Sequence, residues 1–503
     1  MTRLTRTCGT LALAAVLTAC SQSGPPDAQG TQTAEPTYRY DWESLRQAPV
    51  PEWLQDAKFG IFIHWGPYSV PGWSDGRSYS EWYSSLMYWN ESFVEHHRRN
   101  YGEPGEFGYK DFIPMFEAEL FDPDEWAGLF EASGAGFVIP TGEHHDGFAM
   151  WDSDLTDWNA VDMGPRFDFI GRLSEAVRRQ GLRFGVSYHR ERHWGFYTDS
   201  VNTYAEHPQP RPALAAELEA HPEAIGLYGP FGLSEAFMQD YKARFLEIVD
   251  KYQPDFMWID DAPSNSLHPE APAVDRFMNK YQMEMLTDYL NKAEAWGRPV
   301  YFNNKKWQRS NYPAGIGVDD KDYLRLEEIS PRTWLSTGGM AHSYGYDRTE
   351  EAGNKYRSVE TLLEILVDVV SKNGCFLLDV GPRADGTIPE AQKQRLLGIG
   401  EWLGRYGEAV YGTRPWTSFG FDEVRFTRRG DALYAMLLDW PEKGRLTLTS
   451  TESIDPATIE RVQLLGSEAN VDWQAGPGGL ELVLPDKPFD DHVYVVRIDT
   501  SGL

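Results

Sequence analysis

The fold is decided by stretches such as Phe59-Gly60-Ile61-Phe62-Ile63-His64 and Phe256-Met257-Trp258-Ile259-Asp260, in which a short apolar run ends in a polar residue. Such runs alternate with amphipathic stretches from about residue 53 to residue 410, as parallel strands joined by crossover helices do. The expected strands are Phe59–Ile63, Gly136–Pro140, Arg183–Ser187, Asp255–Ile259, Val300–Asn303 and Cys375–Val380. The expected helices are Pro123–Ala132, Asp168–Gln180, Glu235–Tyr252, Val274–Ala295, Ser358–Ser371 and Pro389–Tyr406. This repetition predicts an α/β fold, a TIM-like (β/α) barrel.

Polar residues follow the expected strands immediately. They are His64, Glu143 to Asp146, Tyr188 to Arg190, Asp260 and Asn303 to Lys306. In a barrel these positions converge on one mouth, where active sites of this architecture lie. An open doubly wound sheet would also bring them together, but the sequence has no Gly-rich phosphate loop, so this fold is the second choice.

The sequence pattern changes past Trp416. Short β-rich runs are punctuated by turn residues such as Arg429-Gly430 and Gly476-Pro477-Gly478, which predicts an antiparallel β-sandwich. We therefore expect a catalytic barrel at residues 41–412 and a sandwich at residues 413–503. The sandwich has few clustered chemical residue types, which favours a packing or ancillary role.

The first forty residues have the character of an export signal. Arg3 and Arg6 precede an apolar run from Leu11, and Leu17-Thr18-Ala19-Cys20 resembles a bacterial lipobox. We expect a lipoprotein signal peptide at residues 1–20, a polar tether at residues 21–40, and lipidation of Cys20. The predicted location is periplasmic, or at the outer membrane or cell surface, with the lipid on Cys20 as the only membrane contact.

Charge and cysteine content exclude several classes of partner. Lys and Arg number 47 against 76 Asp and Glu, a net charge of −29 that repels nucleic acid and anionic membranes and favours a neutral ligand. Once Cys8 is removed and Cys20 is acylated, Cys375 is the only free thiol, and its apolar neighbours predict a core position.

Asp260 is the leading candidate for chemistry, with helix capping as the alternative. An Asp at a barrel mouth can attack an anomeric carbon, yet Asp after a strand is also a common N-cap. Three segments with aromatic and hydrogen-bonding residues suit a sugar: His64-Trp65-Gly66, Glu81-Trp82-Tyr83 and His144-His145-Asp146. The adjacent His pair could instead bind a metal, but neighbouring side chains in an extended segment diverge. We therefore expect neither a metal nor another cofactor.

The order of these motifs, followed by Leu377-Leu378-Asp379-Val380-Gly381-Pro382, resembles the α-L-fucosidases of glycoside hydrolase family 29 from about Trp53 to Trp416. The resemblance implies a retaining exo-hydrolase that releases terminal L-fucose from a fucosylated oligosaccharide or glycoconjugate, with Asp260 as the nucleophile. It implies substrate-binding roles for His64, Tyr79, Glu81, Trp82, His144 and His145.

The implied acid/base residue lies in a more variable stretch. Asp322-Tyr323 ahead of Glu327 resembles the family spacing of an Asp-aromatic pair before the catalytic Glu, which selects Glu327 over Glu328. The alternative is that both glutamates are solvated surface charges.

Three segments depart from the family pattern. Glu143 stands where many relatives have Lys, Val186-Ser187-Tyr188-His189-Arg190 replaces a Tyr-rich strand end, and Lys305-Lys306-Trp307 replaces an Asn-Asp-Arg-Trp segment. We therefore expect Lys306 and Tyr188 to bind substrate in a divergent pocket. Tyr188, His189 and Arg190 are candidates to reshape this pocket, with a purely structural strand end as the alternative for each. An exo-glycosidase for a related sugar such as α-L-galactose, and a glycan-binding lipoprotein without activity, remain as alternative functions.

Overall fold

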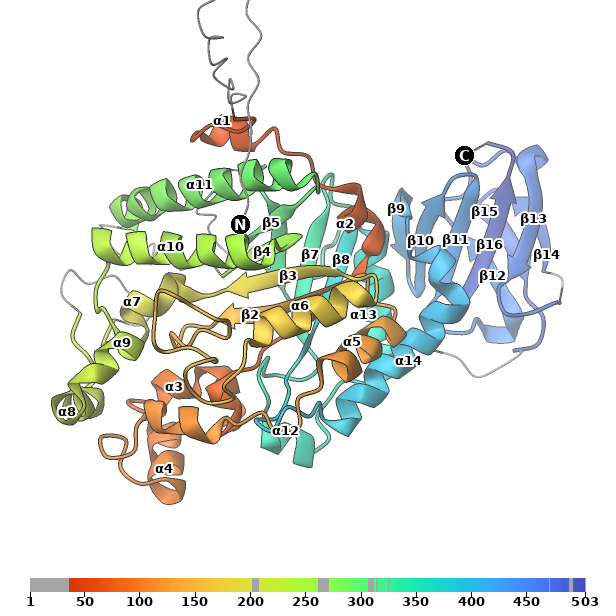
Figure 1. The fold of residues 1–503 in the computed structure, drawn as a ribbon. Helices are drawn as coiled ribbons and strands as arrows, with labels where there is room; N and C mark the ends of the chain where they lie inside the picture. The colour runs from red at the N-terminus through yellow and green to blue at the C-terminus, as the bar shows by residue number, and fades with distance from the viewer. Residues whose placement is uncertain are drawn as a thin grey trace, which may run out of the picture. The chain divides into compact units, whose positions relative to one another are not determined.

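The computed structural model describes residues 36–200, 208–260, 271–305, 312–313, 315–323, 325–469, 471–487 and 492–502. A closed barrel of eight parallel strands forms its larger part (Figure 1). The strands are β1 (Phe59–Ile63), β2 (Phe137–Glu143), β3 (Arg183–Tyr188), β4 (Phe256–Ile259), β5 (Tyr301–Lys305), β6 (Val318–Asp322), β7 (Trp334–Gly339) and β8 (Gly374–Val380). The predicted barrel is thus confirmed, and two of its strands, β6 and β7, were not predicted.

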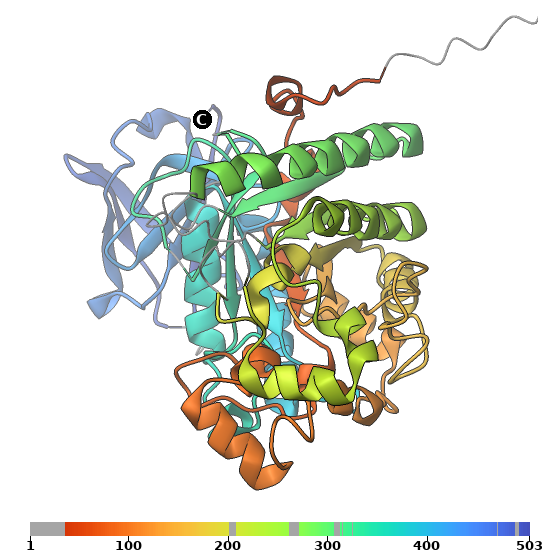
Figure 2. The same ribbon diagram turned by 90° about the vertical axis from the view of Figure 1, so that its left-hand side faces the viewer.

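The longer helices cover the outside of the barrel. They are α5 (Pro123–Ala132), α6 (Phe169–Arg179), α10 (Glu235–Tyr252), α11 (Ala271–Trp296), α13 (Val359–Ser371) and α14 (Glu390–Tyr406). Asp168 caps α6 and Ser358 caps α13. Each side chain accepts a hydrogen bond from a backbone N–H of the first turn, which is why these helices begin there. Figure 2 shows α10 and α11 running side by side.

Shorter elements follow several strands and build the walls of the mouth. After β1 come η1 (Pro67–Ser69), η2 (Ser80–Trp82), α3 (Tyr83–Leu86), α4 (Glu91–Asn100) and η3 (Tyr109–Met115). After β3 come η4 (Arg190–Arg192), α7 (His193–Phe196), α8 (Pro212–Ala220), η5 (Pro222–Ala224) and α9 (Ile225–Tyr228). The remaining short helices are α1 (Trp42–Leu45), α2 (Glu52–Ala57), α12 (Arg348–Ala352) and η6 (Gly407–Ala409).

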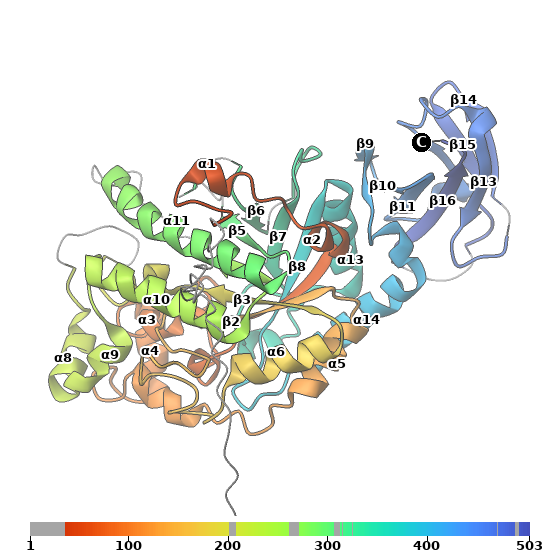
Figure 3. The ribbon, with the colours of Figure 1, turned by 45° about the horizontal axis from the view of Figure 1, so that its top comes forward.

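The C-terminal part forms two antiparallel sheets (Figure 3). The five-stranded sheet contains β9 (Arg414–Phe421), β10 (Val424–Arg429), β11 (Ala432–Leu437), β13 (Ile459–Leu464) and β16 (Tyr494–Thr500). The three-stranded sheet contains β12 (Arg445–Leu448), β14 (Asp472–Gly476) and β15 (Gly479–Val483), and the short helices η7 (Glu442–Gly444) and η8 (Pro456–Thr458) connect strands. Alternate strand residues, among them Phe426, Leu433 and Leu480, are buried in a core between the sheets. This confirms the predicted sandwich.

Side chains fill the barrel interior beneath its mouth. The rings of Phe62 and Trp258 lie 4.9 Å apart between centroids, and the Ser187 hydroxyl lies 3.2 Å from that of Thr141. Residues two apart along a strand face the same side, so Asp260 faces the interior as Trp258 does, and His189 faces it as Ser187 does. The barrel is therefore closed below the mouth, and the residues that follow the strands gather at that mouth.

Cys375 is buried in β8 with its thiol 3.1 Å from the Leu54 carbonyl oxygen, which confirms the predicted core position. None of the helices in the described part of the chain combines the length and apolar character needed to cross a membrane.

Candidate active site

The carboxyl ends of the barrel strands bring together imidazoles and carboxyl groups that are far apart in the sequence. These residues are His64 after β1, His144 and His145 after β2, His189 after β3, Asp260 after β4, Lys305 in β5, Asp322 in β6 and Asp379 in β8. Asp260 and the four histidines are buried as whole residues, and the Lys305 and Asp322 side chains are at most about one-fifth exposed.

Asp260 lies at the centre of this group and is held from both sides. Its Oδ2 lies 3.2 Å from His145 Nε2 and 3.2 Å from His189 Nδ1, and its Oδ1 accepts a hydrogen bond from Lys305 Nζ at 2.8 Å. Burial alone would raise the pKa of Asp260, but its surroundings, chiefly the Lys305 ammonium, hold this pKa well below the ordinary value. Asp260 is therefore an ionised, fixed carboxylate.

Lys305 connects Asp260 to a second carboxyl group. Its Nζ lies 3.2 Å from Asp322 Oδ2, so the contacting oxygens of Asp260 and Asp322 can be no more than about 6 Å apart. Burial, with a smaller contribution from the nearby Asp260 charge, raises the pKa of Asp322 above its ordinary value. The two carboxyl groups thus have pKa values that their surroundings displace in opposite directions.

Asp320, two residues earlier on β6, faces the same interior. Its carboxyl oxygens accept hydrogen bonds from Trp258 Nε1 at 2.8 Å and Thr337 Oγ1 at 2.6 Å. Burial and the neighbouring Asp322 charge raise the pKa of Asp320 to about 7. Because both oxygens are engaged, Asp320 fixes the Trp258 indole beneath the site.

A layer of imidazoles surrounds Asp260. His64 Nδ1 lies 2.7 Å from Asp379 Oδ1, and the His64 ring lies 5.3 Å from that of His189 and 5.6 Å from that of His144. Burial lowers the pKa of His64 well below its ordinary value and raises that of Asp379 well above its own, so this pair shares one proton without a net charge. Such neutral imidazoles can both donate to and accept from hydroxyl groups.

The turn that presents His144 and His145 is locked by its next residues. Asp146 accepts a hydrogen bond from the Tyr109 hydroxyl at 2.5 Å and from the Phe148 backbone N–H at 3.2 Å. Gly147 has a φ of +87°, and a Cβ there would lie 2.6 Å from the His193 ring, so a larger residue would displace the turn.

Residues from the segment after β1 lie beside this cluster. Glu81 accepts a hydrogen bond from the Gly345 backbone N–H at 3.0 Å, and burial raises the pKa of Glu81 to about 7. The Trp82 ring lies 5.5 Å from that of His145, nearly perpendicular to it. Tyr79 stands further out, with its ring 6.0 Å from that of Tyr344, which in turn lies 5.0 Å from His64.

Several buried polar atoms beside this cluster have no hydrogen-bond partner among the described residues. They include His144 Nδ1, Asp322 Oδ1, the Tyr344 hydroxyl and Asp379 Oδ2. Buried polar atoms in proteins are nearly always hydrogen-bonded, so several such atoms beside one cluster suit a ligand rich in donors and acceptors. A sugar, with hydroxyls around its ring, fits this description.

Two predicted site residues lie elsewhere. Tyr188 points outward from β3 and donates a hydrogen bond to the Tyr241 carbonyl oxygen of α10 at 2.9 Å, as the structural alternative for this residue predicts. Glu327 is exposed in a bend after β6, and no hydrogen bond or ion pair joins it to Asp260 or another described residue. Lys306 and Cys20 lie outside the described residues.

Three residues that make these contacts are not among the predicted catalytic and substrate-binding residues. His189, Lys305 and Asp322 all touch Asp260 or Lys305, although the first two stood in segments recognised as departures from the family. Strand alternation is the signal that could have found them. Inward Ser187 implies inward His189, and Asp320 and Asp322 share one face of β6.

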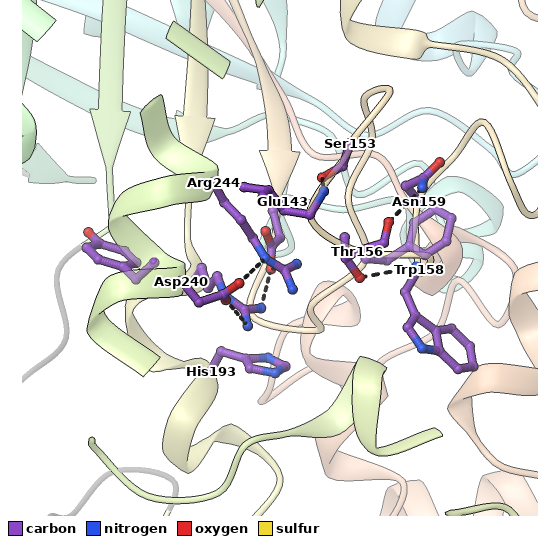
Figure 4. A network of polar contacts seen from close by, with 12 residues as sticks. Glu143, Ser153, Thr156, Trp158, Asn159, His193, Asp240 and Arg244 are labelled. Atoms are coloured by element: carbon purple, nitrogen blue, oxygen red, sulfur yellow. Dashed lines mark hydrogen bonds and ion pairs between the residues drawn. The ribbon is translucent and has the colours of Figure 1, made fainter. Parts of the chain in front are cut away.

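A network of charged residues that includes Glu143, Asp240 and Arg244 lies next to the segments that carry the histidines (Figure 4). Glu143, directly before His144, accepts a hydrogen bond from Arg190 Nη1 at 2.6 Å, while Arg190 Nη2 lies 2.7 Å from Asp240 Oδ2. Arg244 of α10 contacts both carboxylates, at 3.5 Å from Glu143 and 3.1 Å from Asp240. The unusual Glu143 is thus paired with Arg190, another residue of the departing segments.

A barrel mouth with paired carboxyl groups, hydrogen-bonding imidazoles and indole walls defines a glycoside hydrolase. The alpha-L-fucosidase family model matches residues 27–408, and the model of the alpha-L-fucosidase C-terminal domain matches residues 420–499. The chain therefore belongs to the alpha-L-fucosidase family, whose members are glycosidases that act on α-L-fucosyl residues.

Relatives agree with this assignment over nearly the whole chain. Bovine tissue alpha-L-fucosidase is 32% identical over 468 residues, covering 91% of this chain and 89% of its own length. Human tissue alpha-L-fucosidase is 32% identical over 472 residues, covering 92% and 91%. The crystal structure of Thermotoga maritima alpha-fucosidase with a mechanism-based inhibitor has a TM-score of 0.74 at 34% identity, covering 92% of this chain and 100% of its own.

Proposed function

We propose that the protein removes terminal α-L-fucosyl residues from fucosylated glycans with retention of configuration, using Asp260 as nucleophile and Asp322 as acid/base. The Lys305 ammonium shared by the two carboxyl groups is the observation that carries this proposal. The two oxygens that contact Lys305 are at most about 6 Å apart, which allows the ~5–5.5 Å separation of a retaining pair.

In the first step an Asp260 oxygen forms a bond to the anomeric carbon while the bond to the leaving oxygen breaks, and Asp322 gives its proton to that oxygen. In the second step Asp322 takes a proton from water, the water oxygen bonds to the anomeric carbon, and Asp260 leaves. Two displacements at one carbon restore the original configuration.

Lys305 allows Asp322 to change role between the steps. In the free enzyme the Asp260 charge helps raise the pKa of Asp322 and so keeps its proton available. When Asp260 becomes an ester it loses its charge, and Lys305 is left beside Asp322 alone. The pKa of Asp322 then falls, which suits a general base.

Support for the sugar site comes from the layer around Asp260. His64, His144, His145 and Glu81 present donors and acceptors, and Trp82 presents an indole. A Thermotoga maritima alpha-fucosidase structure in complex with fucose, 35% identical with a TM-score of 0.72, agrees with fucose as the ligand.

The test is the stereochemistry of the first product. Purified protein is mixed with a nitrophenyl α-L-fucoside and followed by proton NMR before the released sugar mutarotates. We expect α-L-fucose first, and Asp260→Asn should lower kcat on the order of 10⁴-fold. First release of the β-anomer, or an Asp260→Asn enzyme with wild-type activity, would overturn the scheme.

We also propose that the protein is an exported lipoprotein held at a membrane by acylated Cys20. The support is the lipobox-like Leu17-Thr18-Ala19-Cys20 and the polar residues that follow. Cells fed labelled palmitate should label the wild-type chain but not Cys20→Ser, which should leave the membrane fraction. Equal labelling of both chains would exclude this anchor.

A further inference from the structure

The hydrogen bonds around His145 determine which of its nitrogens faces Asp260 without a proton. His145 Nδ1 lies 2.7 Å from the His189 carbonyl oxygen, which can only accept, so Nδ1 carries the hydrogen. In a neutral ring Nε2 then carries a lone pair and no hydrogen, and this nitrogen lies 3.2 Å from Asp260 Oδ2. A lone pair therefore faces a carboxylate oxygen at hydrogen-bond distance.

His189 reaches the same arrangement through a chain of hydroxyl groups. Thr141 donates to the Ile63 carbonyl oxygen at 3.0 Å, and Ser187 donates to the Thr141 hydroxyl oxygen at 3.2 Å. The Ser187 oxygen accepts from His189 Nε2 at 2.9 Å, which leaves His189 Nδ1 as a second lone pair 3.2 Å from Asp260 Oδ2. Two nitrogens and one oxygen thus converge without a hydrogen between them.

We propose that His145 Nε2, His189 Nδ1 and Asp260 Oδ2 bind a divalent ion of the Zn²⁺ class, which reversibly inhibits the enzyme by occupying its nucleophile. Tetrahedral zinc with ligands at ~2.0–2.1 Å separates them by about 3.3–3.4 Å, close to both nitrogen–oxygen distances here. All three ligand atoms lie within 4.8 Å of one another. A small movement of the imidazoles toward each other completes the triangle and leaves a fourth coordination position for another ligand.

The outer contacts of these ligands are those that metal-binding histidines have. Each imidazole donates its other N–H to an oxygen, His145 to a backbone carbonyl and His189 to a hydroxyl, which fixes the ring and its tautomer. Adjacent side chains diverge, which disfavours His144 and His145 as a ligand pair. The pair proposed here is His145 and His189, which follow different strands, so this objection does not apply.

Lys305 limits the affinity of this site. Its ammonium occupies Asp260 Oδ1 at 2.8 Å, so the carboxylate can offer only Oδ2 and the ion must lie near a positive charge. We therefore expect weaker binding than in a structural zinc site. Imidazole ligands select Zn²⁺ and Cu²⁺ over Mg²⁺ and Ca²⁺, which prefer oxygen.

The test measures binding of Zn²⁺ alone by calorimetry, with full-length protein purified without a polyhistidine tag. We expect one Zn²⁺ per chain, weakened as fucose is added, and a raised KM for nitrophenyl fucoside at unchanged kcat. EDTA should restore the rate, and Mg²⁺ should have no effect. The expected competition with fucose rests on the proposed function.

Two variants locate the ion. His189→Gln should weaken Zn²⁺ binding at least about tenfold, while His221→Gln, which alters an exposed histidine 3.3 Å from Glu223, should bind as the wild type does. Circular dichroism checks that both variants fold, and fucose competition on the wild type needs no variant.

No calorimetric binding to the wild type would overturn the proposal and leave a proton as the group between these atoms. Binding unaffected by saturating fucose, or lost in His221→Gln, would also overturn it. Failure of the proposed function is distinguishable, since a chain that binds Zn²⁺ but cleaves no fucoside keeps the metal site and loses the fucosidase mechanism.

Discussion

Replacing Asp322 by Asn tests the assignment of the acid/base residue most directly. Asn keeps the shape and an oxygen that can accept from Lys305, but it has no proton to give to the leaving oxygen. General acid catalysis contributes about 10²–10⁴-fold, or about 3–5 kcal/mol of transition-state stabilisation. We expect this loss in kcat/KM for a fucosyl disaccharide, whose alkoxide leaves poorly without a proton.

A nitrophenyl fucoside should behave differently because nitrophenolate leaves without protonation. Its kcat/KM should fall less than tenfold, while kcat falls further because the introduced amide cannot activate water, so the fucosyl-enzyme accumulates and KM drops. Azide needs no general base, and it should restore kcat and yield α-L-fucosyl azide. Product identity by NMR and initial rates by absorbance provide the assay.

Glu327→Gln and Glu328→Gln are the matched controls, since both side chains are exposed beyond β6. We expect each to retain kcat/KM for the disaccharide within about twofold of the wild type, well below the range for a lost general acid. A disaccharide-selective loss with azide rescue in Glu327→Gln, and none in Asp322→Asn, would refute the assignment and restore Glu327 as the acid.

Three further results are expected. In the pH profile, kcat/KM should fall as pH rises through the raised pKa of Asp322, because Asp322 must be protonated. It should also fall as pH drops through the depressed pKa of Asp260, because Asp260 must be ionised. An unchanged fall at high pH in Asp322→Asn would contradict this. Glu143→Gln removes one of the carboxylates that pair with buried Arg190 and should lower the free energy of unfolding by about 3–5 kcal/mol in thermal unfolding. Arg461→Gln, from an exposed pair, should lower it by at most about 1 kcal/mol. Equal losses in the two variants would disprove the burial argument. Cys375→Ala should lower the unfolding temperature but leave kcat unchanged, and lost activity in a folded variant would give the thiol a catalytic role.

The sequence predicts the barrel wherever a strand is apolar on both faces. β1 and β4, Phe59–Ile63 and Phe256–Ile259, are buried throughout because helices cover one side and the interior the other. β6 reads Val-Asp-Asp-Lys-Asp, which no search for apolar runs identifies as a strand. Its carboxyl groups are accommodated because Trp258, Thr337 and Lys305 supply hydrogen bonds inside the barrel, a fact that belongs to the assembled fold.

Whether a strand is recognisably apolar also decides which residues of the site could be predicted. His64, His144, His145 and Asp260 each follow a recognisable apolar strand, so both motif and position identify them. Asp322, which we propose as the acid/base in place of Glu327, ends a strand that the sequence pattern does not reveal. The choice between the two carboxyl groups depends on which one reaches Lys305, and only the parallel pairing of β5 with β6 brings Lys305 beside Asp322.

Glu143 joins the segments that carry the histidines of the site. Its backbone oxygen accepts the His189 N–H at 2.9 Å, so the residues that present the His pair and His189 are joined at this point. A lysine there would place a cation beside Arg190 and Arg244 in a buried space, at a cost of several kcal/mol. The exchange to Glu143 is therefore compatible only with the arginines that surround it. The carboxylates of Glu143 and Asp240 and the two guanidinium groups thus form a matched set of charges beside the segments that carry the imidazoles.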